Sequence, residues 1–139
     1  MAKKISDVMS AEPVTVGPHV MLSTAARCMR DNGIGDVLVT DGQQLFGILT
    51  DRDIVVRAVA ENRHPDRVSV AEVCSDEPVS IGPDDDIDLA IHLMREHAIR
   101  RLPVTREGQV VGVVSLGDLA LERDEHSVLA YISATGPNI

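Results

Sequence analysis

The chain has 139 residues, enough for one compact domain or two halves sharing a core, and its formal net charge of −9 opposes non-specific binding to nucleic acid. One Phe, one Tyr and no Trp leave almost no aromatic surface on which single-stranded nucleic acid could stack. Two cysteines predict no disulfide framework. The sequence shows neither an apolar signal region nor an apolar run near the ~20 residues that span a membrane. We therefore expect a cytoplasmic protein with no membrane or nucleic-acid partner.

The first half of the chain predicts the order β-α-β-β-α. Leu22, Ala25, Ala26 and Met29 follow the spacing i, i+3, i+4, i+7, which is typical of a helix with one buried face. The remaining elements of this half are predicted as strands at 13–16, 37–40 and 45–50, a turn containing Gly42, and a helix at 51–62.

The second half predicts the same order after a polar connector at 62–69. Its first helix carries Ile87, Ala90, Ile91 and Met94 at helical spacing, with Asp84 and Asp85 expected at its N-cap and in its first turn. The other elements are predicted as strands at 78–81, 102–105 and 110–115, a turn containing Gly108, and a helix from 116 to 134 whose apolar end, 127–134, would cover the module or a second subunit.

The two halves are copies of one unit. Residues 5–54 match residues 70–119 without a gap at an offset of 65, and 16 of the 50 pairs are identical. Two copies are too few for a solenoid, and one copy alone would bury too little surface to form a stable core. We therefore predict an α+β fold of two domains (1–61 with the N-terminal segment, and 70–139), joined by the linker 62–69. Their sheets would pack face to face around a pseudo-twofold axis and leave a cleft.

Each copy places a hydroxyl three residues before an aspartate, where a strand leads into a helix. These pairs are Thr50–Asp53 and Ser115–Asp118. The pattern predicts a variant of the capping box, in which the hydroxyl accepts a backbone N–H and the carboxylate lies in the first helical turn. The same groups can hold a ligand, because a carboxylate accepts both hydroxyls of a ribose diol. One side chain can serve both roles, so both interpretations stay open.

The duplicated unit resembles a tandem pair of cystathionine-β-synthase (CBS) domains, known as the Bateman module. The resemblance rests on "EPVTV", "IGDVLV" and "GILTDRDI" in the first copy, and on "EPVSI", "IRRLPV" and "GVVSLGDL" in the second. It covers nearly the whole chain, as in stand-alone two-domain proteins of actinobacteria. It implies a sensing or regulatory module that binds AMP, ADP, ATP or S-adenosylmethionine between the repeats, without an obligatory cofactor, and that forms a homodimer.

The resemblance also implies which residues contact the ligand. Asp53 and Asp118 would contact the ribose, and Thr50 and Ser115 would contact the ribose or a phosphate. Arg100 and Arg101 would contact a phosphate. The base would be contacted by Thr15, Ser80 and the backbone at 34–37 and 99–102, which includes Asp36, Val37 and Leu102.

The first copy departs from this pattern. It has Gly35 and Asp36 where the second copy has the two arginines, and an acid there would repel a phosphate. Arg52 could compensate, and the second copy has Gly117 at that position. We therefore expect two unequal sites, one of which could be empty. Arg100 and Arg101 could equally form a solvated surface pair.

Other functions are weaker predictions from the sequence. No nucleophile–base arrangement, phosphate-cradling glycine loop or metal-ligand spacing is visible, so we predict neither an enzyme nor a metal site. The main alternative is a ligand-free structural or protein-interaction module, with a stress-related role as one variant, in which the Thr/Ser–Asp pairs act only as caps. A redox response through Cys28 and Cys74 is a minor third hypothesis.

Overall fold

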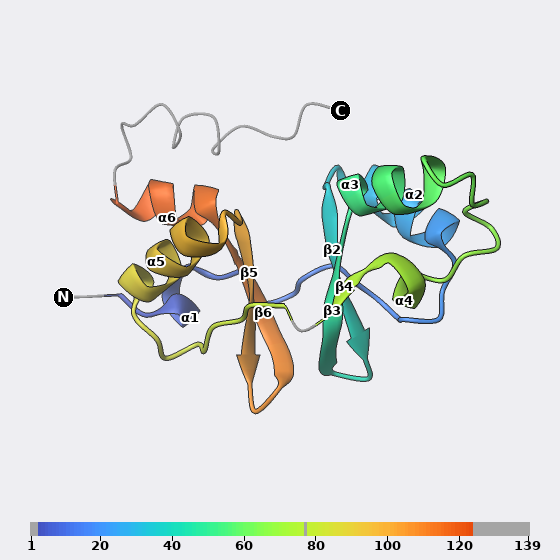
Figure 1. Cartoon of the computed structure of the whole chain (residues 1–139). Helices are drawn as coiled ribbons and strands as arrows, with labels where there is room; N and C mark the ends of the chain where they lie inside the picture. The colour runs from blue at the N-terminus through green and yellow to red at the C-terminus, as the bar shows by residue number, and fades with distance from the viewer. Residues whose placement is uncertain (1–2, 77, 124–139) are drawn as a thin grey trace. The chain divides into compact units, whose positions relative to one another are not determined.

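The computed structural model describes residues 3–76 and 78–123, which form two compact units. One unit contains residues 14–76 and 78, and the other contains residues 3–13 together with 79–123. In each, the helices lie on one side of the strands (Figure 1).

The unit of the first repeat is built on a β-hairpin. Strand β2 runs antiparallel to β3, β1 pairs in parallel with β2, and β4 pairs antiparallel with β3. Its elements are β1 (Thr15–Val16), α2 (Leu22–Asn32), β2 (Asp36–Asp41), β3 (Gln44–Thr50), α3 (Asp51–Ile54), the π-helical turn η1 (Val55–Val59), α4 (Val70–Val73) and β4 (Ser75–Asp76).

The unit of the second repeat has an equivalent hairpin of β5 and β6, and both hairpins carry an irregularity at the same place, after Val39 and after Val104. The predicted strand at 78–81 is reduced to one parallel bridge between Ile81 and Val104. The elements are α1 (Ile5–Val8), α5 (Ile87–His97), β5 (Arg101–Arg106), β6 (Gln109–Ser115) and α6 (Leu116–Arg123). The part of the predicted last helix beyond residue 123, with its apolar run at 127–134, lies outside the described residues.

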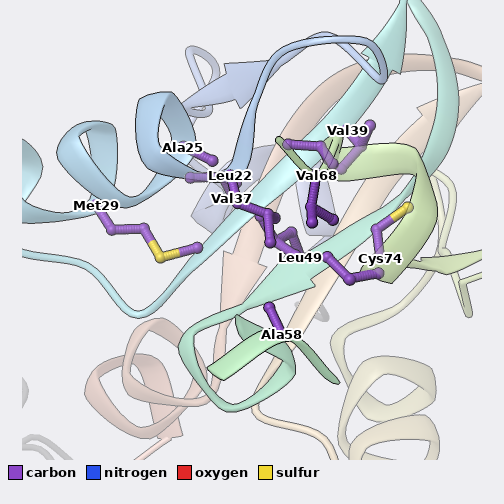
Figure 2. Packing of buried hydrophobic residues seen from close by; sticks show 11 residues of the cluster. Leu22, Ala25, Met29, Val37, Val39, Leu49, Ala58, Val68 and Cys74 are labelled. Atoms are coloured by element: carbon purple, nitrogen blue, oxygen red, sulfur yellow. The ribbon is translucent and has the colours of Figure 1, made fainter. Parts of the chain in front are cut away.

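Each unit has its own aliphatic core, as the scarcity of aromatic residues requires. In the first repeat, the predicted helical stripe of Leu22, Ala25 and Met29 packs with Val37, Val39 and Leu49 of the hairpin (Figure 2). In the second, Ile87, Ala90 and Met94 pack with Leu102, Val104 and Val114. These cores and the strand order confirm the predicted α+β repeat.

The short segment that leads into each repeat packs in the unit of the other repeat. Ile5 of α1 is fully buried in the core of the second repeat, and Ser10 exchanges two backbone hydrogen bonds with Val113. Val70 and Val73 of α4 are fully buried in the core of the first repeat. The first predicted domain includes residues 1–13, whereas residues 3–13 pack with the second repeat, because Ile5 of α1 is buried in that core.

Two glycines make this exchange possible. A Cβ added to Gly112 would lie 2.7 Å from both Met9 Sδ and the carbonyl oxygen of Ser10. A Cβ added to Gly47, the equivalent residue of the first repeat, would overlap the carbonyl oxygen of Ser75. The absence of a side chain at these positions lets the lead-in segment approach the hairpin backbone.

Two local predictions differ from the structure. The N-cap of α5 is Asp86, whose side chain accepts the backbone N–H of Asp88, whereas Asp85 accepts the N–H of Gly82 and closes the preceding turn. The helix predicted at 51–62 begins as α3 but continues as η1, with π-type hydrogen bonds. Three of the five residues of η1 are valines, whose β-branched side chains crowd an α-helical turn.

Candidate functional site

Both Thr/Ser–Asp pairs form capping boxes. Thr50 Oγ1 accepts the backbone N–H of Asp53 at 3.0 Å, and the N–H of Thr50 donates to Asp53 Oδ2 at 2.9 Å. In the second repeat, Ser115 Oγ accepts the N–H of Asp118 at 3.1 Å, and the N–H of Ser115 donates to Asp118 Oδ2 at 2.9 Å. The capping interpretation is confirmed in both copies.

The capping boxes leave hydrogen-bonding capacity on both side chains. Each hydroxyl uses a lone pair as acceptor and keeps its own hydrogen as a donor. Within residues 3–76 and 78–123, no hydrogen bond reaches Oδ1 of Asp53 or Asp118. All four side chains are only half-buried. A cap of this geometry can therefore still accept a diol and donate to an oxygen of a ligand.

The hairpin brings the start of its first strand beside the cap. Asp36 is the register partner of Thr50, and Arg101 is the register partner of Ser115. Directly opposed residues in adjacent strands point to the same face of the sheet. We call residues 35–36 with 50–53 the first cap turn, and residues 100–101 with 115–118 the second cap turn.

One further backbone hydrogen bond closes each cap turn. The N–H of Asp51 donates to the carbonyl oxygen of Gly35 at 2.8 Å, and the N–H of Leu116 donates to that of Arg100 at 2.7 Å. The two turns thus share one backbone arrangement. Asp51 belongs to the first turn and was not predicted; its position between Thr50 and Asp53 was the available signal.

The predicted base-contacting residues fall into two groups. Thr15 is exposed on β1 next to Leu38, and Ser80 is exposed with its Oγ 3.3 Å from Thr105 Oγ1. Val37 and Leu102 are 2% and 0% exposed, with their side chains in the two cores. Only the backbone of these two residues is available to a ligand.

The predicted cationic residues border the turns. Arg52 and Arg100 are exposed, and Arg101 is half-buried at the start of β5. The backbone N–H of Arg52 donates to Asp51 Oδ1 at 2.8 Å, which holds the Asp51 carboxylate within the first turn.

The two cysteines lie at the core of the first repeat as free thiols. Burial raises the pKa of the Cys74 thiol, and the carboxylates of Asp53 and Asp76 raise it further. Cys74 is therefore a protonated thiol near neutral pH, a poor nucleophile and metal ligand. Cys28 is half-buried and packs against the same core.

The described residues contain neither a cluster of metal ligands nor a membrane-spanning helix. No three His, Cys, Asp or Glu side chains gather in a way that could hold a metal ion in residues 3–76 and 78–123. Over the same part of the chain, no helix is both long and apolar enough to cross a bilayer.

The comparison with protein families matches the model described as "CBS domain" to residues 5–59 and to residues 70–125. Hypoxic response protein 1 of Mycobacterium tuberculosis is 34% identical over 129 residues, which are 92% of this chain and 90% of that protein. CBS domain-containing protein YhcV of Bacillus subtilis is 39% identical over 119 residues, covering 86% and 84% of the two chains.

Solved structures agree with these matches. The crystal structure of Hypoxic Response Protein I, described with two coordinated zinc ions, has a TM-score of 0.79 at 34% identity and covers 85% of this chain and 97% of its own. The CBS domain pair of protein MJ0100, in complex with 5′-methylthioadenosine and S-adenosyl-L-methionine, has a TM-score of 0.77 at 24% identity, covering 86% and 94%. At that identity, the second likeness shows the fold alone.

Proposed function

Because the chain belongs to the CBS-domain family and carries two copies of that domain, we propose that it is a non-catalytic regulatory module that binds an adenosine compound at its cap turns. The candidates are AMP, ADP, ATP and S-adenosylmethionine. One observation carries the proposal: in both repeats the cap aspartate keeps Oδ1 available, within the described residues, beside a hydroxyl that can still donate.

The chemistry of adenosine suits this arrangement. A carboxylate is a pure acceptor, so Asp53 or Asp118 can take the 2′- and 3′-hydroxyls of a ribose. The neighbouring hydroxyl of Thr50 or Ser115 can donate to a ribose or phosphate oxygen. Thr15 and Ser80, on the first extended segment of each repeat, are our candidates for contact with the base.

Thermal unfolding against the four candidate compounds tests the proposal. A compound present at about a hundred times its Kd stabilises the folded protein by about 2.7 kcal/mol. We expect at least one compound to do so, and expect the double variant Asp53→Asn/Asp118→Asn to lose that stabilisation. Asn keeps a carbonyl acceptor for the cap, so the free variant should remain folded.

The matched control is Asp66→Asn/Asp84→Asn, which removes two exposed carboxylates of surface ion pairs outside both turns. It should keep the stabilisation by ligand. If no compound stabilises the unmodified protein, or if the Asp53/Asp118 variant responds as strongly as the control, the proposal is wrong and the ligand-free alternative replaces it.

We propose a second copy of the chain as a protein partner, and we retain the cytoplasmic location as a prediction. The observation that favours self-association is the apolar surface of η1, where Val55, Val56 and Val59 are 57%, 46% and 59% exposed. Analytical ultracentrifugation should show a dimer that Val55→Asp/Val59→Asp disrupts. Phe46→Ser, at another exposed apolar side chain, should leave the dimer intact. A monomeric unmodified protein would contradict this assignment.

A further inference from the structure

The two lead-in segments, residues 3–10 and 68–75, dock through equivalent backbone hydrogen bonds. The donors are the N–H groups of Ile5 and Ser6 in one segment and of Val70 and Ala71 in the other. Each bond is 2.8 to 2.9 Å long, and the acceptors, in the same order, are the carbonyl oxygens of Asp85, Pro83, Val20 and Pro18. Donors and acceptors are both related by the offset of 65, so these bonds hold the two segments alike.

The two segments differ in how many apolar side chains they bury. The segment 68–75 buries Val68, Val70, Val73 and Cys74, each at most 8% exposed, in the core of the first repeat. At the equivalent positions of the other segment, Lys3 is exposed, and Val8 and Met9 are half-buried. Among the described residues 3–10, Ile5 alone is buried. Because burial of apolar surface is the main contribution to docking, the segment 3–10 is held more weakly.

A side chain from the helix after each hairpin also holds each segment, and the two interactions differ in kind. Arg57 and Glu122 are equivalent residues of the repeat. Arg57 Nη1 donates to the carbonyl oxygen of Val73 at 3.1 Å. Glu122 Oε1 instead forms an ion pair with Lys3 Nζ at 3.1 Å, with the two side chains 29% and 52% exposed. Salt screens this exposed pair of opposite charges more than it weakens a hydrogen bond to a neutral carbonyl.

We infer that the segment 3–10 is a salt-sensitive strap. It opens from the second repeat by local unfolding, with the Lys3–Glu122 ion pair as its latch, while the segment 68–75 stays docked on the first repeat. Opening uncovers the part of the core that Ile5 fills and frees the backbone of Val113, with which Ser10 exchanges two hydrogen bonds. The strap thereby controls access to this face of the second repeat, independently of any ligand at the cap turns.

Amide hydrogen exchange of the full chain, followed by NMR, tests the local opening. The protection factors of the Ile5 and Ser6 amides should be at least about tenfold lower than those of their matched amides, Val70 and Ala71. They should also lie below those of the β5–β6 hairpin and respond little to low urea, since a local opening exposes little surface. Exchange of Ile5 and Ser6 at the rate of the hairpin amides would show that the segment leaves only when the repeat unfolds, and would overturn the inference.

The variant Glu122→Gln tests the latch. Raising the salt concentration from about 20 to about 500 mM should lower the protection of Ile5 and Ser6, relative to their matched amides, by up to about fivefold in the unmodified protein. This response should disappear in Glu122→Gln. The matched control Glu96→Gln, which removes another exposed carboxylate of the same unit, should keep it. Equal salt responses of the two variants would show that Lys3–Glu122 is not the latch.

Reversal of the charges shows whether the two side chains act through direct contact. Lys3→Glu places two carboxylates together and should lower the protection of Ile5 and Ser6 at low salt. The double variant Lys3→Glu/Glu122→Lys should restore both the protection and its salt dependence. A double variant as poorly protected as Lys3→Glu alone would contradict the latch. Circular dichroism checks that each variant is folded.

Discussion

At the scale of single residues, Thr50 separates the energetic role of the cap from its proposed role in binding. Thr50→Ala removes the acceptor for the N–H of Asp53, and loss of such an N-cap costs about 1 kcal/mol. Thr50→Ser keeps the hydroxyl and should keep most of the stability. Urea denaturation measures both variants, and equal stability of Thr50→Ala and the unmodified protein would contradict the capping role.

The carboxylate of Glu72 caps the start of α4, and this interaction depends on pH. The backbone N–H of Ser69 donates to Glu72 Oε2 at 2.7 Å, and this bond, followed by those from the Ser69 hydroxyl and Arg63, holds the pKa of Glu72 below its usual value of 4.5. The folded pKa is lowered, so the stabilisation is present above pH 4.5 and is lost as the pH falls through the folded pKa.

The variant Glu72→Gln reports on this carboxylate. The unmodified protein should be more stable than the variant at pH 6, and the difference should shrink as the pH falls from 4.5 toward 3. Denaturant unfolding at several pH values measures the difference. A constant difference between pH 6 and pH 3 would show that the charge of Glu72 does not contribute.

At the scale of elements, the exchanged lead-in segments predict crossed effects of mutation. Ile5 precedes the first repeat but is buried in the core of the second, so Ile5→Ala should cost about 2–5 kcal/mol and lower hydrogen-exchange protection mainly in residues 79–123. Val70→Ala is the matched variant and should lower protection mainly in residues 14–68. Loss of protection within the repeat that follows each mutated residue would contradict the exchange.

This exchange could not be predicted from the sequence. Residues 5–8 and 70–73 are equivalent in the repeat. In each, the backbone N–H of the N-cap residue donates to a carboxylate three residues on, Lys4 to Asp7 and Ser69 to Glu72, so the local patterns fit either core equally well. Local propensity sets the short helix, but long-range packing selects which core it joins. The helical stripes were predictable, because their period alone defines the buried face. The strands were predictable as short β-rich runs between turn signals, although β2 and β5 do not alternate in burial.

The start of α5 shows a second limit of local reasoning. Asp84, Asp85 and Asp86 are three consecutive carboxylates, and each could serve as an N-cap by residue type. The choice depends on where the chain leaves the preceding turn, and there the N–H of Gly82 binds Asp85. Asp86 is left to cap the helix.

At the scale of the whole molecule, the gapless repeat predicted the family and the fold, both now shown by the comparisons. The repeat also located both cap turns, because a hydroxyl and an aspartate three residues apart at the start of a helix form a capping box through local hydrogen bonds alone. The contribution of Asp51 needed the structure, because the hydrogen bond from its N–H to the carbonyl oxygen of Gly35 joins residues that are far apart in the sequence.

Amide chemical shifts of the folded chain during titration with AMP test the central claim most directly. Binding at the cap turns predicts saturable shifts that are largest at residues 100–101 and 115–118, smaller at 35–36 and 50–53, and absent from the exposed valines of η1. Shifts that map outside both cap turns, or no shift with any of the four candidate compounds at millimolar concentration, would contradict it.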